Sequence, residues 1–137
     1  MSLLNSFNKV FIMGIGGSGM SSIAKYLKQK GYHVEGYDQR ISYITNILEN
    51  DGVRTYQDYE DFIYERDVLY IISSAVNLDN TFLKNFKKNK NVISRPSFFR
   101  ELSNEKDIIG ITGTHGKTST TALVSHIFHL IIKMYHL

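Results

Sequence analysis

The sequence predicts an α/β fold built on a doubly wound, mostly parallel, Rossmann-like sheet. Apolar runs of strand length alternate with helical patterns about five times along the chain, as crossovers between parallel strands require. The first apolar run ends in the pattern G-x-G-x-x-G, and a later one ends in a glycine-rich turn that contains GKT. We therefore expect one sheet domain, followed by the first strand, phosphate loop and helix of a second domain.

The five expected strands are short and apolar, as in a sheet that is covered on both faces. They are Lys9–Ile15, Tyr32–Tyr37, Val53–Tyr56, Val68–Ser73 and Asn91–Ser94. Helices are expected at Ser18–Lys30, Ile41–Asn50, Asp58–Glu65, Asp79–Lys88 and Ser97–Ser103. In the first helix, apolar residues at helical spacing predict a buried face made of Met20, Ile23, Ala24 and Leu27. Pro96, the only proline, suits the first turn of the last helix.

The second domain is expected to open with a buried strand at Ile108–Ile111. A polar connector, Asn104–Asp107, leads into this run, so the expected domains are residues 1–106 and 107–137. A helix is expected from Lys117, and its tail is apolar but interrupted by histidines and Lys133. The tail falls short of the roughly 20 apolar residues that cross a membrane, and we expect it to be a partly exposed helix.

The first glycine-rich loop predicts a site that holds a diphosphate without cleaving it. It consists of Gly14, Gly16, Gly17, Ser18 and Gly19, between an expected strand and an expected helix. The loop has no lysine and offers backbone amides and the positive end of the helix. Asp38 ends the next strand 19 residues after Gly19, which is the spacing of a ribose-binding acid. Ser74 follows another strand end, where open parallel sheets bind ligands.

The second loop, T-G-T-H-G-K-T, predicts a nucleoside triphosphate site. Gly113 and Gly116 let backbone amides surround phosphates, and Lys117 adds a positive charge in phosphoryl transfer. The Thr118 hydroxyl is suited to ligate Mg²⁺, which makes ATP and Mg²⁺ the expected cofactors. The loop departs from G-x-x-x-x-G-K-[ST] because Ile111 stands where the first glycine belongs.

Composition narrows the classes of partner. The 137 residues are 42% hydrophobic and 21% charged, as in a soluble globular protein, and their net charge of +3 is too mild to indicate nucleic acid. The basic run Lys84–Lys90 fits a solvated helix end. No cysteine is present, which excludes disulfides and thiolate chemistry and fits the cytoplasm. No membrane partner is expected.

Five segments together resemble the Mur ligases, in order and spacing, over about residues 8–123. They are GIGGSGMSSIA, GYD at 36–38, SSAVNLDN at 73–80, NVISRPSFFREL and TGTHGKTSTTAL. Within the family, the pattern is most similar to the branch that joins L-alanine to UDP-N-acetylmuramate. The branch that recycles murein tripeptide shares the second loop and ranks behind it, and folylpolyglutamate synthetases share only the ATP loop.

The resemblance implies a reaction and a set of binding residues. ATP would phosphorylate the carboxylate of UDP-N-acetylmuramate, the amine of L-alanine would attack the acyl phosphate, and phosphate would leave. The resemblance places the UDP-sugar on the first loop, with Asp38 near the uridine and Ser74 also in contact. It places ATP on Gly113, Thr114, His115, Gly116, Lys117, Thr118 and Ser119. His115 is equally consistent with a side chain that only packs the loop.

Because family members have three domains, we expect this chain to be an N-terminal fragment that binds UDP-sugar without turnover. The orphaned apolar start of the second domain is also expected to favour self-association. Two alternatives stay open on the residues alone. One is an NAD-binding oxidoreductase domain, supported by the first loop and Asp38, and the other is a non-catalytic nucleotide-binding module.

Overall fold

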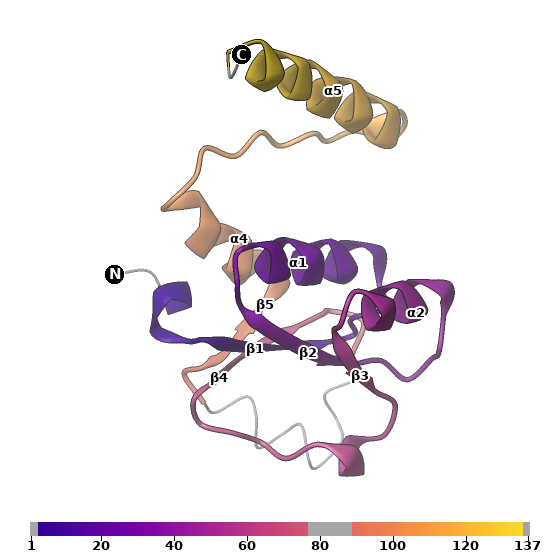
Figure 1. Cartoon of the computed structure of the whole chain (residues 1–137), viewed down its shortest axis with the longest axis vertical. Coiled ribbons are helices and arrows are strands. Elements are labelled where there is room, and N and C mark those ends of the chain that lie inside the picture. The colour runs from indigo at the N-terminus through magenta and orange to yellow at the C-terminus, as the bar shows by residue number, and fades with distance from the viewer. Residues whose placement is uncertain (1–2, 77–88, 136–137) are drawn as a thin grey trace. The chain divides into compact units, whose positions relative to one another are not determined.

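The computed structural model describes residues 3–76 and 89–135, and the chain divides into two compact units (Figure 1). The first unit is Met1–Lys106 and the second is Asp107–Leu137. The helix expected at Asp79–Lys88 lies outside the described residues, as does most of the basic run Lys84–Lys90.

A five-stranded sheet forms the centre of the first unit, in the order β3-β2-β1-β4-β5. The strands are β1 (Lys9–Met13), β2 (His33–Tyr37), β3 (Arg54–Tyr56), β4 (Val68–Ile72) and β5 (Val92–Ser94). Every neighbouring pair is parallel, and Lys9 of β1 lies opposite both His33 and Val68. The prediction of a doubly wound, parallel α/β sheet is confirmed.

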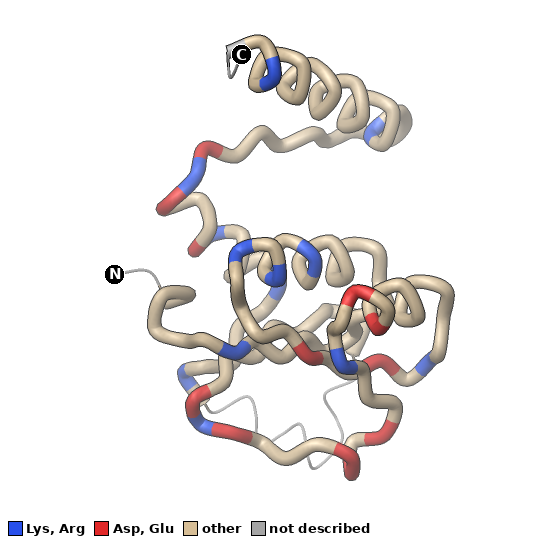
Figure 2. Tube along the Cα trace, in the orientation of Figure 1, with Lys and Arg blue, Asp and Glu red and all other residues tan. Residues whose placement is uncertain are grey.

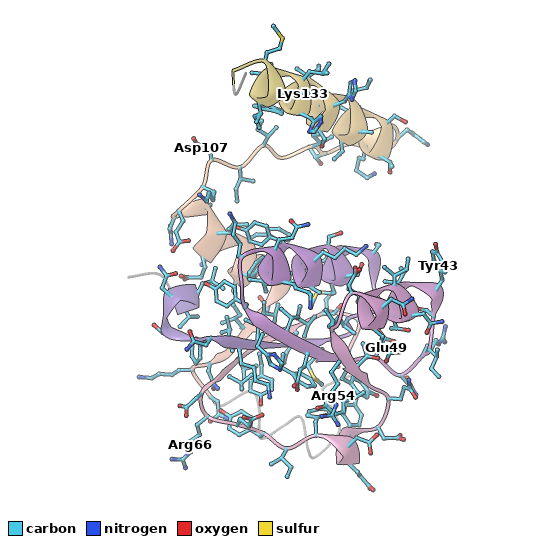
Figure 3. All side chains as sticks on the ribbon, in the orientation of Figure 1. Tyr43, Glu49, Arg54, Arg66, Asp107 and Lys133 are labelled. Atoms are coloured by element: carbon cyan, nitrogen blue, oxygen red, sulfur yellow. The ribbon has the colours of Figure 1, made fainter. Side chains whose placement is uncertain are left out.

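Three helices cover one face of this sheet (Figure 1). They are α1 (Ser18–Gln29), α2 (Tyr43–Asn50) and α4 (Arg95–Ser103). The four residues predicted to form the inner face of α1 are all buried there. The side chain of Ser94 accepts a hydrogen bond from the backbone N–H of Ser97, and Pro96 lies in the first turn of α4 as predicted. Tyr43, at the start of α2, is 80% exposed (Figure 3).

An aromatic cluster covers part of the other face and corrects one prediction. Only a 3₁₀ turn, η2 (Tyr59–Asp61), replaces the helix expected at Asp58–Glu65. Phe62 packs on Phe11 with ring centroids 4.4 Å apart, and Tyr64 stacks on Tyr70 at 5.2 Å. An extended chain turns residues two positions apart toward the same face, whereas a helix does not. The prediction was wrong because these aromatic contacts decide the backbone conformation.

The second unit contains the helix α5 (Lys117–Tyr135), which begins at the predicted residue. The predicted strand Ile108–Ile111 is wrong: these residues are not assigned to a strand, and Ile108 and Ile109 are 48% and 60% exposed. A strand requires hydrogen bonds to a neighbour, and residues 108–111 are not among the paired strands of the described sheet. The charged residues of α5 lie only near its ends, at Lys117 and Lys133 (Figure 2).

Large apolar side chains are exposed along α5. They are Leu123, Ile127, Phe128, Leu130, Ile131, Ile132 and Met134. None of the helices in the described part of the chain is both long and apolar enough to span a bilayer. Self-association through these residues stays a prediction.

Candidate nucleotide-binding site

The first glycine-rich loop leaves the sheet at the carboxyl end of β1. Gly14 has a φ of +80°, a conformation that favours glycine, and its N–H donates to the carbonyl oxygen of Tyr37 at 2.7 Å. The N–H of Ile15 donates to the same oxygen at 3.0 Å, and the N–H of Gly17 donates to the carbonyl of Gly14 at 3.1 Å. Two of the loop's donors therefore hold the turn against β2, and a third closes the turn itself.

Asp38 holds the middle of the same loop. Its Oδ2 accepts a hydrogen bond from the N–H of Gly16 at 2.8 Å, and its Oδ1 accepts one from the N–H of Arg40 at 3.1 Å. A Cβ atom added to Gly16 would lie 2.8 Å from that Oδ2, so the glycine is required by close approach. The carboxylate predicted to bind a ribose already has a structural role, in which it braces the loop.

Two amides at the end of the loop have no such partner. Ser18 and Gly19 form the start of α1, and their N–H groups donate to no atom in residues 3–76 and 89–135. The first turn of α1 contains no acidic residue. An anion placed here would receive two N–H donors and the positive end of the helix dipole. Of the predicted loop residues, Ser18 and Gly19 are thus the ones whose backbone donors are available.

A pocket of about 420 Å³ lies beside the loop at the same edge of the sheet. It is lined by Gly14 and Gly17, by residues 37–40, and by Tyr59 and Ser73. Tyr59 stacks on Tyr37 with ring centroids 4.2 Å apart. Ser73, and not the predicted Ser74, is among the described lining residues, and Ser74 is exposed. The pocket has the size and the mixture of aromatic and polar groups that suit a nucleoside.

Arg95 also reaches this loop, and the loop sequence gives no sign of it. It is the first residue of α4, directly after β5. A Cβ atom added to Gly19 would lie 2.8 Å from Arg95 Nη1, so the guanidinium covers the start of α1. The sequence signal that points to it is an arginine immediately after the last strand, within the segment NVISRPSFFREL.

The second loop turns through two glycines with positive φ and lies in exposed chain. Gly113 and Gly116 have φ values of +147° and +75°. The Nζ of Lys117 donates to the carbonyl oxygen of Gly113 at 2.6 Å, so the lysine folds back across the loop. Gly113, Thr114, His115, Gly116, Lys117, Thr118 and Ser119 are all exposed. The Thr118 hydroxyl could supply one oxygen ligand to Mg²⁺. The described residues contain no group of three or more His, Cys, Asp or Glu side chains that could hold a metal ion.

A separate cluster of charges lies at the amino end of the sheet. Glu35, whose side chain is 10% exposed, lies 3.3 Å from Lys9 Nζ and 3.0 Å from His33 Nε2. Burial alone raises the pKa of Glu35, but its contacts with His33, Lys9 and Tyr56 outweigh burial and lower the pKa below its ordinary value. These residues stabilise the sheet at the end away from the glycine-rich loop.

A model of the Mur ligase family, described as its catalytic domain, matches residues 9–107. The chain belongs to the Mur ligase family. A UDP-N-acetylmuramate–L-alanine ligase from Cytophaga hutchinsonii is 38% identical over 133 residues, which cover 92% of this chain and 28% of that relative. An enzyme of the same name from a Hydrogenobaculum species is 40% identical over 127 residues, covering 90% of this chain and 28% of that relative. The chain therefore spans less than a third of these Mur ligases.

Two solved Mur ligase structures resemble the fold. A UDP-N-acetylmuramate–alanine ligase from Thermotoga maritima superimposes with a TM-score of 0.77 at 31% identity, over 91% of this chain and 30% of that one. A murein peptide ligase from Psychrobacter arcticus gives a TM-score of 0.69 at 25% identity, over 88% of this chain and 26% of that one. The resemblance to Mur ligases inferred from the five segments is confirmed, and both relatives and structures favour the branch that it ranked first.

Proposed function

We propose that this chain provides the UDP-sugar-binding part of an ATP-dependent ligase that joins L-alanine to UDP-N-acetylmuramate for peptidoglycan synthesis in the cytoplasm. The observation that carries the proposal is the start of α1, where the N–H groups of Ser18 and Gly19 are available beside the pocket of about 420 Å³. A diphosphate on these amides and a uridine in the pocket match the two ends of a sugar nucleotide. The names of the Mur ligase relatives support that choice of ligand.

Different residues of the first unit would contact different parts of the UDP-sugar. Asp38 fixes the loop through Gly16, which keeps the start of α1 directed at the ligand. The carboxylate of Asp38 repels phosphate, and this places the diphosphate nearer Ser18 and Gly19 than Gly16. Ser73 and Tyr59 line the pocket that would receive the nucleoside, and Ser74 would contact the sugar from the adjacent exposed turn.

In the second unit, we assign the ATP phosphates to residues 113–119, with Lys117 stabilising charge in phosphoryl transfer and Thr118 holding Mg²⁺. ATP supplies the phosphoryl group that activates the sugar's carboxylate. Before nucleotide enters, Lys117 would have to release the carbonyl of Gly113 and turn toward the phosphates. Because Ile108 and Ile109 are exposed, the loop lacks the sheet support that phosphate loops have in packed domains. We therefore propose that these 137 residues alone bind UDP-sugar and do not ligate.

The NAD-binding alternative is less well supported because Asp38 directs both carboxylate oxygens at backbone N–H groups. Titration calorimetry of the purified chain with UDP-N-acetylmuramate and with NAD⁺ tests the choice. We expect heat only with the UDP-sugar, and no phosphate release when ATP, Mg²⁺ and L-alanine are added. Heat with NAD⁺ alone would replace the proposal with the oxidoreductase alternative.

A further inference from the structure

We propose that Arg95 is the charged contact to the diphosphate of the UDP-sugar, acting together with the amides of Ser18 and Gly19. The proposal rests on the proposed function, and it adds a residue from a segment far from the glycine-rich loop in sequence. Arg95 also changes the chemistry of the site, because the first loop itself contains no cationic side chain.

Arg95 lies at the start of α1 and is held there by packing. Nη1 of Arg95 lies 2.8 Å from the place of a Cβ on Gly19, so the guanidinium lies against the start of α1, where a larger residue would make the arginine tip shift. α4 is held in place by Phe98, which is 1% exposed and belongs to the same core cluster as Met20 and Ile23 of α1. The two helices are thus packed on the same face of the sheet, and Arg95 is delivered by a fixed element.

The charges around Arg95 favour an anion. Arg95 is the first residue of α4 and also lies at the first turn of α1, so it faces the positive ends of two helices. A cation is disfavoured at a helix N-terminus. No carboxylate in the described ranges lies within 4.0 Å of Arg95, and no acidic residue occurs in the first turn of either helix. An anion between the guanidinium and the amides would relieve this repulsion.

The donors of Arg95 and of the two amides fit the geometry of a diphosphate. A guanidinium presents a planar fork of donors that binds two phosphate oxygens at once, and the two amides present a second set of donors. A diphosphate has enough oxygens for both sets, whereas a nucleoside has no phosphate for either. Arg95 is therefore expected to make the site select diphosphates over nucleosides.

The test compares Arg95→Ala and Arg95→Lys with the wild type, by calorimetry with UDP-N-acetylmuramate, uridine and inorganic pyrophosphate. Arg100→Ala is the matched control, since Arg100 is an exposed arginine on the same helix. We expect Arg95→Ala to weaken UDP-sugar binding about 10- to 100-fold, as loss of a charge-assisted contact implies. Arg95→Lys should recover part of the loss, and Arg100→Ala should bind as the wild type does.

Thermal unfolding distinguishes a binding role of Arg95 from a structural one, because the two roles predict opposite changes in the unfolding midpoint. Removing the cation from two helix N-termini should raise the unfolding midpoint of Arg95→Ala by about 2–5 °C. A lower midpoint, or equal loss of uridine and UDP-sugar binding, would show that Arg95 supports the fold and would overturn the proposal.

The ligands also separate the two proposals. Unchanged UDP-sugar binding by Arg95→Ala would overturn the role of Arg95 and leave the proposed function standing. Another result is that the wild type binds pyrophosphate but not the UDP-sugar, and that Arg95→Ala binds pyrophosphate more weakly. It would support the role of Arg95 in anion binding and contradict the proposed function. Absence of binding to either ligand by the wild type would contradict both.

Discussion

The two glycine-rich loops start from similar sequences and end in different surroundings. Before the first loop, Val10 and Ile12 of β1 are fully buried between neighbouring parallel strands. Before the second loop, Ile108 and Ile109 are exposed and have no neighbouring strand among the described residues. Glycine spacing thus specifies the turn, whereas the strands on either side decide whether the turn becomes part of a packed site.

The largest expected effect comes from glycine substitutions that test this contrast. A Cβ on Gly36 would lie 2.6 Å from the carbonyl oxygen of Ile12, whereas a Cβ on Gly110 would meet nothing within 4 Å. Gly36→Ala should lower the free energy of unfolding by about 3 kcal/mol, through overpacking against the backbone. Gly110→Ala should change it by less than about 0.5 kcal/mol. Urea unfolding followed by circular dichroism measures both, and equal effects would remove the contrast between the units.

The next largest effect on stability is expected from Asp38, whose carboxylate holds the first loop by hydrogen bonds. Asp38→Ala removes the acceptor for the N–H groups of Gly16 and Arg40, and should lower the unfolding free energy by about 1–3 kcal/mol. The UDP-sugar should bind more weakly as well, because the start of α1 is less firmly held. Asp38→Asn retains one acceptor oxygen and should lose about half as much stability. Wild-type stability in Asp38→Ala would mean that the loop does not depend on this carboxylate.

A smaller effect concerns pH and the first unit alone. The pKa of Glu35 is lowered from 4.5 in the folded state, so the stability it contributes is present above that value. The unfolding free energy should decrease as the pH falls below 4.5 through the folded-state pKa. Glu35→Gln should make the unfolding free energy depend less on pH in this range. Urea unfolding of both proteins, measured from pH 3 to pH 6 in steps of about half a pH unit, would show the difference. Identical curves would show that Glu35 does not couple folding to protonation.

The smallest effect on the first unit is expected from Lys117→Ala. The lysine is exposed and bonds only within the second loop, to Gly113 and Thr114. UDP-sugar affinity should stay within about twofold of the wild type and stability within about 0.5 kcal/mol, while any ATP affinity should be lost. Calorimetry with both ligands measures this, and reduced UDP-sugar binding would show that the second loop contributes to the first site.

The sequence was most informative where each pattern has a single structural solution. The apolar runs predicted the five strands, and helical spacing predicted the buried face of α1, because both depend on burial in this domain. The pattern failed at Asp58–Glu65, where Phe62 and Tyr64 pack in an extended chain, and at Ile108–Ile111, which pair with no strand among the described residues. Both failures come from long-range contacts that local spacing does not contain.

The candidate site also contains residues that the sequence predicted and residues that only the structure identifies. Gly14 to Gly19 and Asp38 were identified from spacing, but spacing does not show which amides are already used. The structure shows that Gly14, Gly16 and Gly17 donate within the protein and leaves Ser18 and Gly19. Arg95 lies 76 positions after Gly19, and only the sheet order brings its helix back to the loop.

The most direct test of the account is nuclear magnetic resonance of the isotope-labelled chain, titrated with UDP-N-acetylmuramate. We predict that the amide signals of Ser18 and Gly19 shift, together with those of residues 37–40, while the signals of residues 113–119 stay in place. Shifts confined to residues 113–119, with none at Ser18 and Gly19, would contradict it.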